Sequence, residues 1–180
     1  MPVEHLGTGF YGKIPATGDF VGRGLPVDFV RAWDRWVASH LAPLQSSGLW
    51  PDEVALRFLL GSNANGPMAG IVVPSGDRAG RSFPLTVAAP PSATLTGLAI
   101  SASDWFDDVE AVAEAARHGA VGADEFAREL AGLPFPPAEP DGEVVLGMLL
   151  WTRICVPMEV DPAEPRAVLD RLLAASWETN

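Results

Sequence analysis

The sequence has little cysteine, no long hydrophobic run and no recognisable export signal, and each of these absences excludes a class of protein. Cys155 is the single cysteine among 180 residues, so neither an intramolecular disulfide nor a cysteine-based zinc site can form. The longest apolar candidate, residues 144–151, is interrupted by Gly147 and falls short of the roughly 18 residues that a membrane-spanning helix needs. Residues 1–5 offer neither the basic nor the apolar region of a secretory signal. We therefore expect a protein that is neither exported nor inserted into membranes.

Basic residues are also scarce. The chain has 12 Lys and Arg against 23 Asp and Glu, a formal net charge of -11. Nucleic acids and anionic lipid surfaces are bound mainly by neutralising their negative charge, so this balance argues against both as partners. The imbalance lies in one half of the chain: residues 1–85 hold 7 basic and 7 acidic residues, whereas residues 86–180 hold 5 and 16. All of the net charge therefore belongs to the second half.

Patterns that would specify a reaction are missing as well. The sequence has neither the G-x-S-x-G turn of serine hydrolases nor the H-E-x-x-H helix of zinc proteases. His5, His40 and His118 are not spaced as paired metal ligands. Asp107, Glu110 and Glu114 share one helix face, which we interpret as a solvated face. We predict no catalytic residues, no metal site and no cofactor.

The remaining sequence predicts a single α+β domain over residues 1–180. Its centre is a mainly antiparallel or mixed sheet of about five or six strands, covered by helices. A helix opened by Leu25 and Pro26 carries an apolar stripe, and Trp33, Trp105 and Trp151 fit the core. Strands are expected at 8–14, 54–60, 70–73, 83–88 and 144–151, and a turn or a further strand at 154–159. Further helices are expected at 101–118, 124–130 and 165–175, and a proline-rich loop at 133–142.

Two segments rich in Gly, Pro and Arg have unusual loop chemistry. Residues 12–26 place six Gly and Pro turn formers between two apolar elements, and residues 74–86 place two arginines in a turn between two strands. The first is not a Walker A loop, because Ile14 follows Lys13 where Ser or Thr is required. Together the segments supply a cluster of candidate site residues: Lys13, Asp19, Arg23, Ser75, Asp77, Arg78 and Arg81.

Three interpretations of this cluster remain open. In the first, Asp19, Asp77, Arg23, Arg78 and Arg81 form an intramolecular network that pins the two loops together. In the second, the arginines bind a protein partner or an anion such as a phosphopeptide, since a guanidinium can grip carboxylate or phosphate with two hydrogen bonds. In the third, the chain is a small phosphate- or nucleotide-binding hydrolase that uses the Lys13, Asp19, Asp77, Arg78 and Arg81 cluster.

The two segments taken together resemble the signature of the TagF (ImpM) family. The matching patterns are Gly-Phe-Tyr-Gly-Lys-Ile-Pro-x-x-Gly-Asp-Phe-Val-x-Arg-x-Leu-Pro at 9–26 and Pro-Ser-x-Asp-Arg-x-Gly-Arg-x-Phe-Pro-Leu-Thr at 74–86. Residues 149–152, Leu-Leu-Trp-Thr, also look like part of a family strand, whereas the acidic part over 95–180 is divergent.

The resemblance implies a function that composition alone does not. A TagF-like protein is expected to be a cytoplasmic, non-catalytic, post-translational repressor of type VI secretion system assembly or firing. It would act by stoichiometric binding to the forkhead-associated (Fha) scaffold protein of that system. The absence of a catalytic constellation agrees with such a mechanism.

Overall fold

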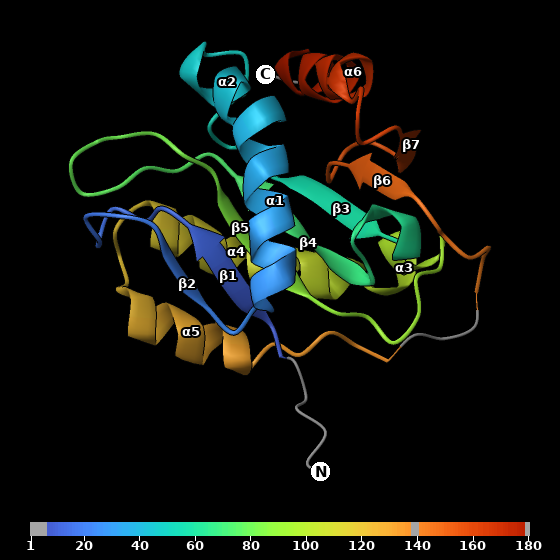
Figure 1. Cartoon of the computed structure of the whole chain (residues 1–180), viewed down its shortest axis with the longest axis horizontal. Helices are drawn as coiled ribbons and strands as arrows, with labels where there is room; N and C mark the ends of the chain where they lie inside the picture. The colour runs from blue at the N-terminus through green and yellow to red at the C-terminus, as the bar shows by residue number, and fades with distance from the viewer. Residues whose placement is uncertain (1–6, 138–140, 179–180) are drawn as a thin grey trace.

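A seven-stranded sheet forms the centre of the computed structural model, which describes residues 7–137 and 141–178 (Figure 1). Each pair of neighbouring strands is antiparallel, and the order across the sheet is β2-β1-β5-β4-β3-β6-β7. The strands are β1 Gly9–Gly12, β2 Val21–Arg23, β3 Leu56–Leu60, β4 Met68–Val73, β5 Leu85–Ala89, β6 Met148–Trp151 and β7 Met158–Val160. The predicted α+β class is confirmed, with seven strands where five or six were expected.

Helices cover both faces of the sheet. One face packs against α1 (Val27–His40), α2 (Ala42–Ser46) and α6 (Arg166–Trp177). The other packs against α3 (Leu98–Ser101), α4 (Ser103–Arg117) and α5 (Ala123–Ala131). Figure 1 shows α1 crossing in front of the sheet, with α4 and α5 behind it. Because both faces are covered, the protein has two apolar cores separated by the sheet.

The central strands are largely apolar because both of their faces are covered. Successive side chains of a strand point to opposite faces, so a strand covered on both sides favours apolar residues at nearly all positions. In β3, Phe58 and Leu60 enter the core under α1, while Leu59 enters the core under α4. All five residues of β3 are buried, including Arg57.

Helix α1 is fixed by one apolar stripe. Phe29, Trp33 and Val37 recur every four residues and are buried against the sheet. The indole nitrogen of Trp33 donates a hydrogen bond of 2.8 Å to the Thr86 hydroxyl on β5, so its one polar atom is satisfied. The expectation that Trp33, Trp105 and Trp151 lie in the core is confirmed.

The differences from the sequence-based expectations are local. The segment expected to be a loop between Lys13 and Leu25 contains the short edge strand β2, and helices α2 and α3 were not predicted. Cys155 is half-buried. The proline-rich loop has no helix or strand over residues 133–137, and its residues 138–140 lie outside the described residues. Residues 1–5, which were predicted to carry no export signal and which include His5, also lie outside the described residues. Within the described ranges, no helix combines the length and apolarity required to cross a bilayer.

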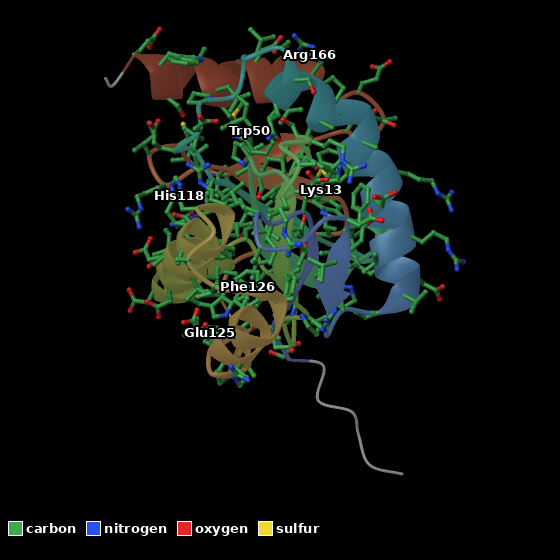
Figure 2. The ribbon with its side chains drawn as sticks, turned by 90° about the vertical axis from the view of Figure 1, so that its left-hand side faces the viewer. Lys13, Trp50, His118, Glu125, Phe126 and Arg166 are labelled. Carbon is green, nitrogen blue, oxygen red and sulfur yellow. The ribbon has the colours of Figure 1, made fainter. Side chains whose placement is uncertain are left out.

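Helix α5 offers a direct test of the two-core arrangement. Phe126 is fully buried, with its ring 4.5 Å from that of Phe10 on β1, whereas its neighbour Glu125 is exposed (Figure 2). We expect Phe126→Ala to lower the free energy of unfolding by about 3–5 kcal/mol, because a cavity replaces a packed ring. Glu125→Ala should change it by less than about 1 kcal/mol. Urea titration measures both, and equal effects would contradict this packing.

Candidate functional site

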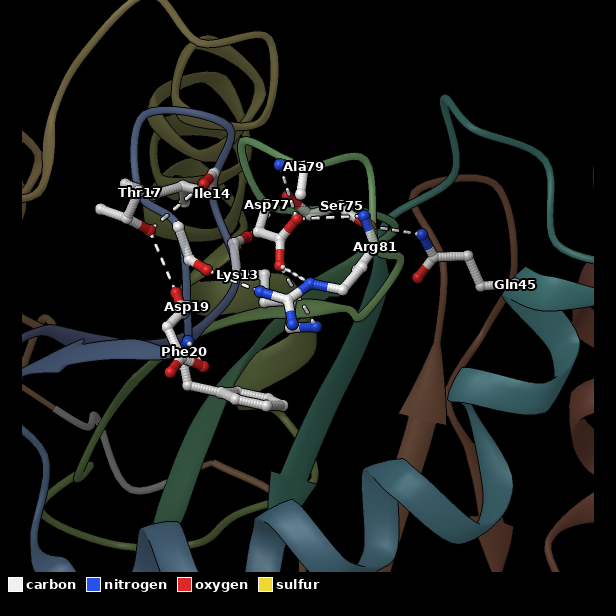
Figure 3. Close-up of polar contacts among 11 residues, drawn as sticks. Lys13, Ile14, Thr17, Asp19, Phe20, Gln45, Ser75, Asp77, Ala79 and Arg81 are labelled. Carbon is white, nitrogen blue, oxygen red and sulfur yellow. Dashed lines mark hydrogen bonds and ion pairs between the residues drawn. The ribbon is translucent and has the colours of Figure 1, made fainter.

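The two Gly/Pro/Arg segments meet at one end of the sheet. Strand β5 runs antiparallel to both β1 and β4, so the ends of β1 and β4 lie beside the beginning of β5. The loop after β1 (residues 13–20) and the loop between β4 and β5 (residues 74–84) therefore emerge side by side (Figure 3).

Asp77 lies at the centre of this meeting point, and its side chain is completely buried. Its Oδ1 accepts the backbone N–H groups of Ala79 at 2.9 Å and Arg81 at 3.0 Å. Its Oδ2 accepts the Arg81 Nε–H at 2.8 Å and lies 3.6 Å from the ammonium nitrogen of Lys13. Lys13 is the only lysine in the chain and is itself buried. One carboxylate thus binds donors from both loops.

The remaining hydrogen bonds between the two loops are accepted by main-chain carbonyls of the first loop. The Ser75 hydroxyl donates to the Lys13 carbonyl at 2.7 Å. The guanidinium groups of Arg78 and Arg81 donate at 2.5 and 2.7 Å to the carbonyls of Ala16 and Gly18, and the Arg78 backbone N–H donates to that of Thr17. We call this set the Asp77 clamp: Lys13, Ser75, Asp77, Arg78 and Arg81.

Hydrogen bonding keeps the clamp carboxylate ionised. Burial on its own raises the pKa of Asp77, but the backbone N–H groups of Arg81 and Ala79 and the charge of the Arg81 guanidinium together bring that pKa below its ordinary value. A buried carboxylate that receives donors on both oxygens is stable as the anion.

Two predicted site residues lie outside the clamp. Asp19 is exposed: its carboxylate accepts the backbone N–H of Phe20 at 2.7 Å, and its carbonyl accepts the Thr17 hydroxyl at 3.1 Å. Arg23 stands opposite Phe10 in the β1–β2 register, so strand alternation directs it to the α5 face, where it lies 3.7 Å from exposed Asp124. The structure therefore brings together five of the seven candidate residues.

Two residues that sequence reasoning missed support the clamp. The Phe20 ring lies under the Lys13 ammonium at 4.8 Å and packs edge-on against Phe83. Gln45 on α2 donates to the Ser75 carbonyl at 2.6 Å. Gln45 lies outside both segments and no local pattern marks it, whereas Phe20 was available as an aromatic residue within the first segment.

The geometry offers no support for a phosphate-binding loop. Gly7, Gly12 and Lys13 do have the glycine spacing of G-x-x-x-x-G-K, with Ile14 in the last position. However, residues 9–12 form strand β1, and no helix begins after Lys13, whose chain turns and returns as β2. A phosphate cradle needs a loop leading into a helix N-terminus.

Hydrolase chemistry at the same cluster is equally unsupported. Such an enzyme needs a carboxylate or nucleophile that a substrate can reach. Asp77 is buried with its oxygens bound to donors of its own chain, and the Ser75 hydroxyl is bound to the Lys13 carbonyl. The arrangement is that of a structural clamp.

A second charged network corrects the interpretation of the acidic face of α4 as merely solvated. Arg57, with 4% of its side chain exposed, donates to Glu110 at 2.6 Å and Asp107 at 2.7 Å. Arg153 reaches Asp107 at 3.0 Å, and Arg117 binds Glu114 at 2.7 Å. The face therefore neutralises cations of its own chain. Among the described residues, no group of three or more His, Cys, Asp or Glu is placed to hold a metal ion.

Fold and site together define a class: an antiparallel α+β domain whose two Gly/Pro/Arg loops are joined by a buried carboxylate. Comparison with known proteins identifies a family within this class. Residues 9–133 match the TagF N-terminal domain, described as type VI secretion system-associated. The crystal structure of PA0076 from Pseudomonas aeruginosa PAO1 aligns with a TM-score of 0.65 and 34% identity, over 91% of this chain and 76% of that one. No curated protein matches.

The chain therefore belongs to the TagF family, and its role is related to type VI secretion. The family assignment predicted from the two segments is confirmed. Residues 9–133 include both segments and helices α1 to α5, while β6 and β7 extend the same sheet beyond the matched region.

The clamp predicts a pH-dependent loss of stability. Asp77→Asn removes the charge and presents an N–H group to the Arg81 or Lys13 donors, so the melting temperature at pH 7 should fall well below that of the wild type. Because folding lowers the pKa of Asp77, the stability it contributes is complete above pH about 4 and is lost as the pH falls through the folded-state pKa.

Thermal unfolding of wild type and variant from pH 7 to pH 2 tests this. The difference between them should stay constant down to about pH 4 and then shrink. Asp19→Asn makes the same chemical change at an exposed site and should leave the melting temperature nearly unchanged. A gap that persists undiminished to pH 2, or equal effects of the two variants, would contradict the assignment.

The Arg57 network predicts strong coupling between a buried arginine and a partly buried carboxylate. Arg57→Leu leaves Glu110, whose side chain is 15% exposed, without its nearest cation and should cost about 3–5 kcal/mol. The double variant Arg57→Leu/Glu110→Leu should regain much of this loss. Urea denaturation of the single and double variants measures the coupling, and strictly additive effects would rule it out.

Proposed function

We propose that this protein is a cytoplasmic, non-catalytic, post-translational repressor of type VI secretion system assembly or firing, and that it acts by binding the Fha scaffold protein. Membership of a secretion-associated family is the observation that carries the proposal. The Asp77 clamp supports the proposal, because the charged side chains of the two segments bind one another and hold the two loops together.

We also propose that residues 1–180 act as one TagF-like unit. Strand β6, from beyond the matched region, pairs with β3 and joins the edge strand β7 to the sheet. The later elements therefore complete the fold that positions the two loops. In this proposal the Asp77 clamp serves binding indirectly, by fixing the shape of the first segment.

Stoichiometry distinguishes a binding repressor from a catalytic one. Titrating the purified chain into the cognate Fha scaffold in a calorimeter should give saturation at a fixed molar ratio. Trace amounts of the chain should leave the mass of the scaffold unchanged, because no bond is made or broken. Failure of the intact chain to bind the scaffold would refute the proposal, as would a covalent change in the scaffold at catalytic amounts.

The clamp should matter for binding even when the chain is folded. At a temperature well below its melting point, Asp77→Asn should weaken scaffold binding several-fold, because the two loops lose their common anchor. Asp19→Asn, with the same loss of charge at an exposed site, should bind like the wild type. Equal affinity of all three proteins would show that the clamp has no part in recognition.

A further inference from the structure

A groove lies between α1 and the edge strand β2, and the first Gly/Pro/Arg segment forms its floor. Tyr11, Gly22 and Gly24 line the floor, and Val27, Arg31 and Arg35 of α1 line the wall. The volume of this α1 groove is about 490 Å³. These floor residues belong to residues 9–26 but take no part in the Asp77 clamp, so their presence calls for another explanation.

Two glycines give the groove its depth. Gly22 lies directly opposite Tyr11 in the strand register, and a Cβ atom at Gly22 would come within 3.2 Å of the Tyr11 ring. Gly24 adopts a φ of 79°, which side chains rarely tolerate. The Tyr11 hydroxyl donates to Asp34 at 2.8 Å, and burial, followed by this bond and the charge of Asp34, raises the pKa of Tyr11 so that it remains a donor. The floor is thus bare main chain beside a fixed ring.

The charge of the groove is opposite to that of the protein. Arg31 and Arg35 line it with one acid, Asp34, which gives 2 − 1 = +1 on a chain of net charge -11, because the Arg23 side chain lies on the opposite face of the sheet beside Asp124. Arg31 and Arg35 are four residues apart on α1, so they project from one side of the helix. Both are exposed, and neither has an ion-pair partner within the described residues. Elsewhere Arg57, Arg81, Arg117, Arg153 and Arg166 each pair with acids of the chain.

We propose that the α1 groove binds an extended acidic segment of the protein partner. Carboxylates of that segment pair with Arg31 and Arg35, and an apolar side chain packs on Leu25 and on Val27, which is 71% exposed. An extended segment presents side chains alternately to the two sides, and the glycine floor lets its main chain approach closely. This inference rests on the proposed function, since the partner is the scaffold that the chain is proposed to bind.

Charge reversal in the groove tests the inference. Arg31→Glu/Arg35→Glu should weaken binding to the Fha scaffold by about ten-fold or more, because two attractive contacts become repulsive. The matched control is Arg128→Glu/Arg171→Glu, two exposed arginines on α5 and α6 for which no ion pair is described, which produces the same net charge. The control should bind within about two-fold of the wild type. Unchanged melting temperatures verify that both variants are folded.

Cross-linking identifies the occupant. A photoreactive amino acid in place of Val27 should cross-link, in the intact complex, to a scaffold segment rich in Asp and Glu. A cross-link to a basic segment or to a second copy of this chain would overturn the inference, as would no cross-link or equal losses in the two double variants. These results differ from failure of the proposed function, in which the wild-type chain does not bind the scaffold at all.

Discussion

The buried carboxylate of Asp77 is the contact on which the geometry of both Gly/Pro/Arg segments depends. A charge in the interior is tolerated only when it is hydrogen-bonded and paired. Asp77 accepts hydrogen bonds from two backbone N–H groups and one guanidinium, and it forms an ion pair with the Lys13 ammonium at 3.6 Å. Lys13 belongs to the first loop and Arg81 to the second, so neither loop can move without breaking the set. The position of the first loop in turn determines where β2 returns along β1, and β2 forms one side of the α1 groove.

Acidic and basic groups are distributed in a way that composition alone conceals. The second half of the chain carries the whole net charge, yet Asp107, Glu110 and Glu114 on α4 are paired with Arg57, Arg153 and Arg117. The first half is neutral by count, but Arg31 and Arg35 project from α1 with no described partner. A surface that differs in sign from its own protein is best suited to a partner of the opposite sign, and such complementarity favours rapid and selective association.

Sequence patterns were informative where one physical signal dominates. The apolar stripe after Pro26 predicted that α1 has a buried face, which carries Phe29, Trp33 and Val37, and apolar runs located the strands that are covered on both sides. Strand β2 was missed because it has only three residues, one of them glycine, and its pairing comes entirely from β1. Asp19 and Arg23 were placed in the cluster by proximity in sequence, but strand alternation and the turn separate them from it. Arg57 and Gln45 could not be assigned, because their partners lie far away along the chain.

Amide hydrogen exchange measures most directly whether one carboxylate joins the two loops. Donors such as the Arg78 amide, which bonds to the Thr17 carbonyl, and the Ala79 and Arg81 amides, which bond to Asp77, report on the clamp. In Asp77→Asn, residues 13–20 and 74–84 should lose protection together, while the β3–β4 ladder exchanges as in the wild type. Loss of protection in one loop alone, or in neither, would contradict the account.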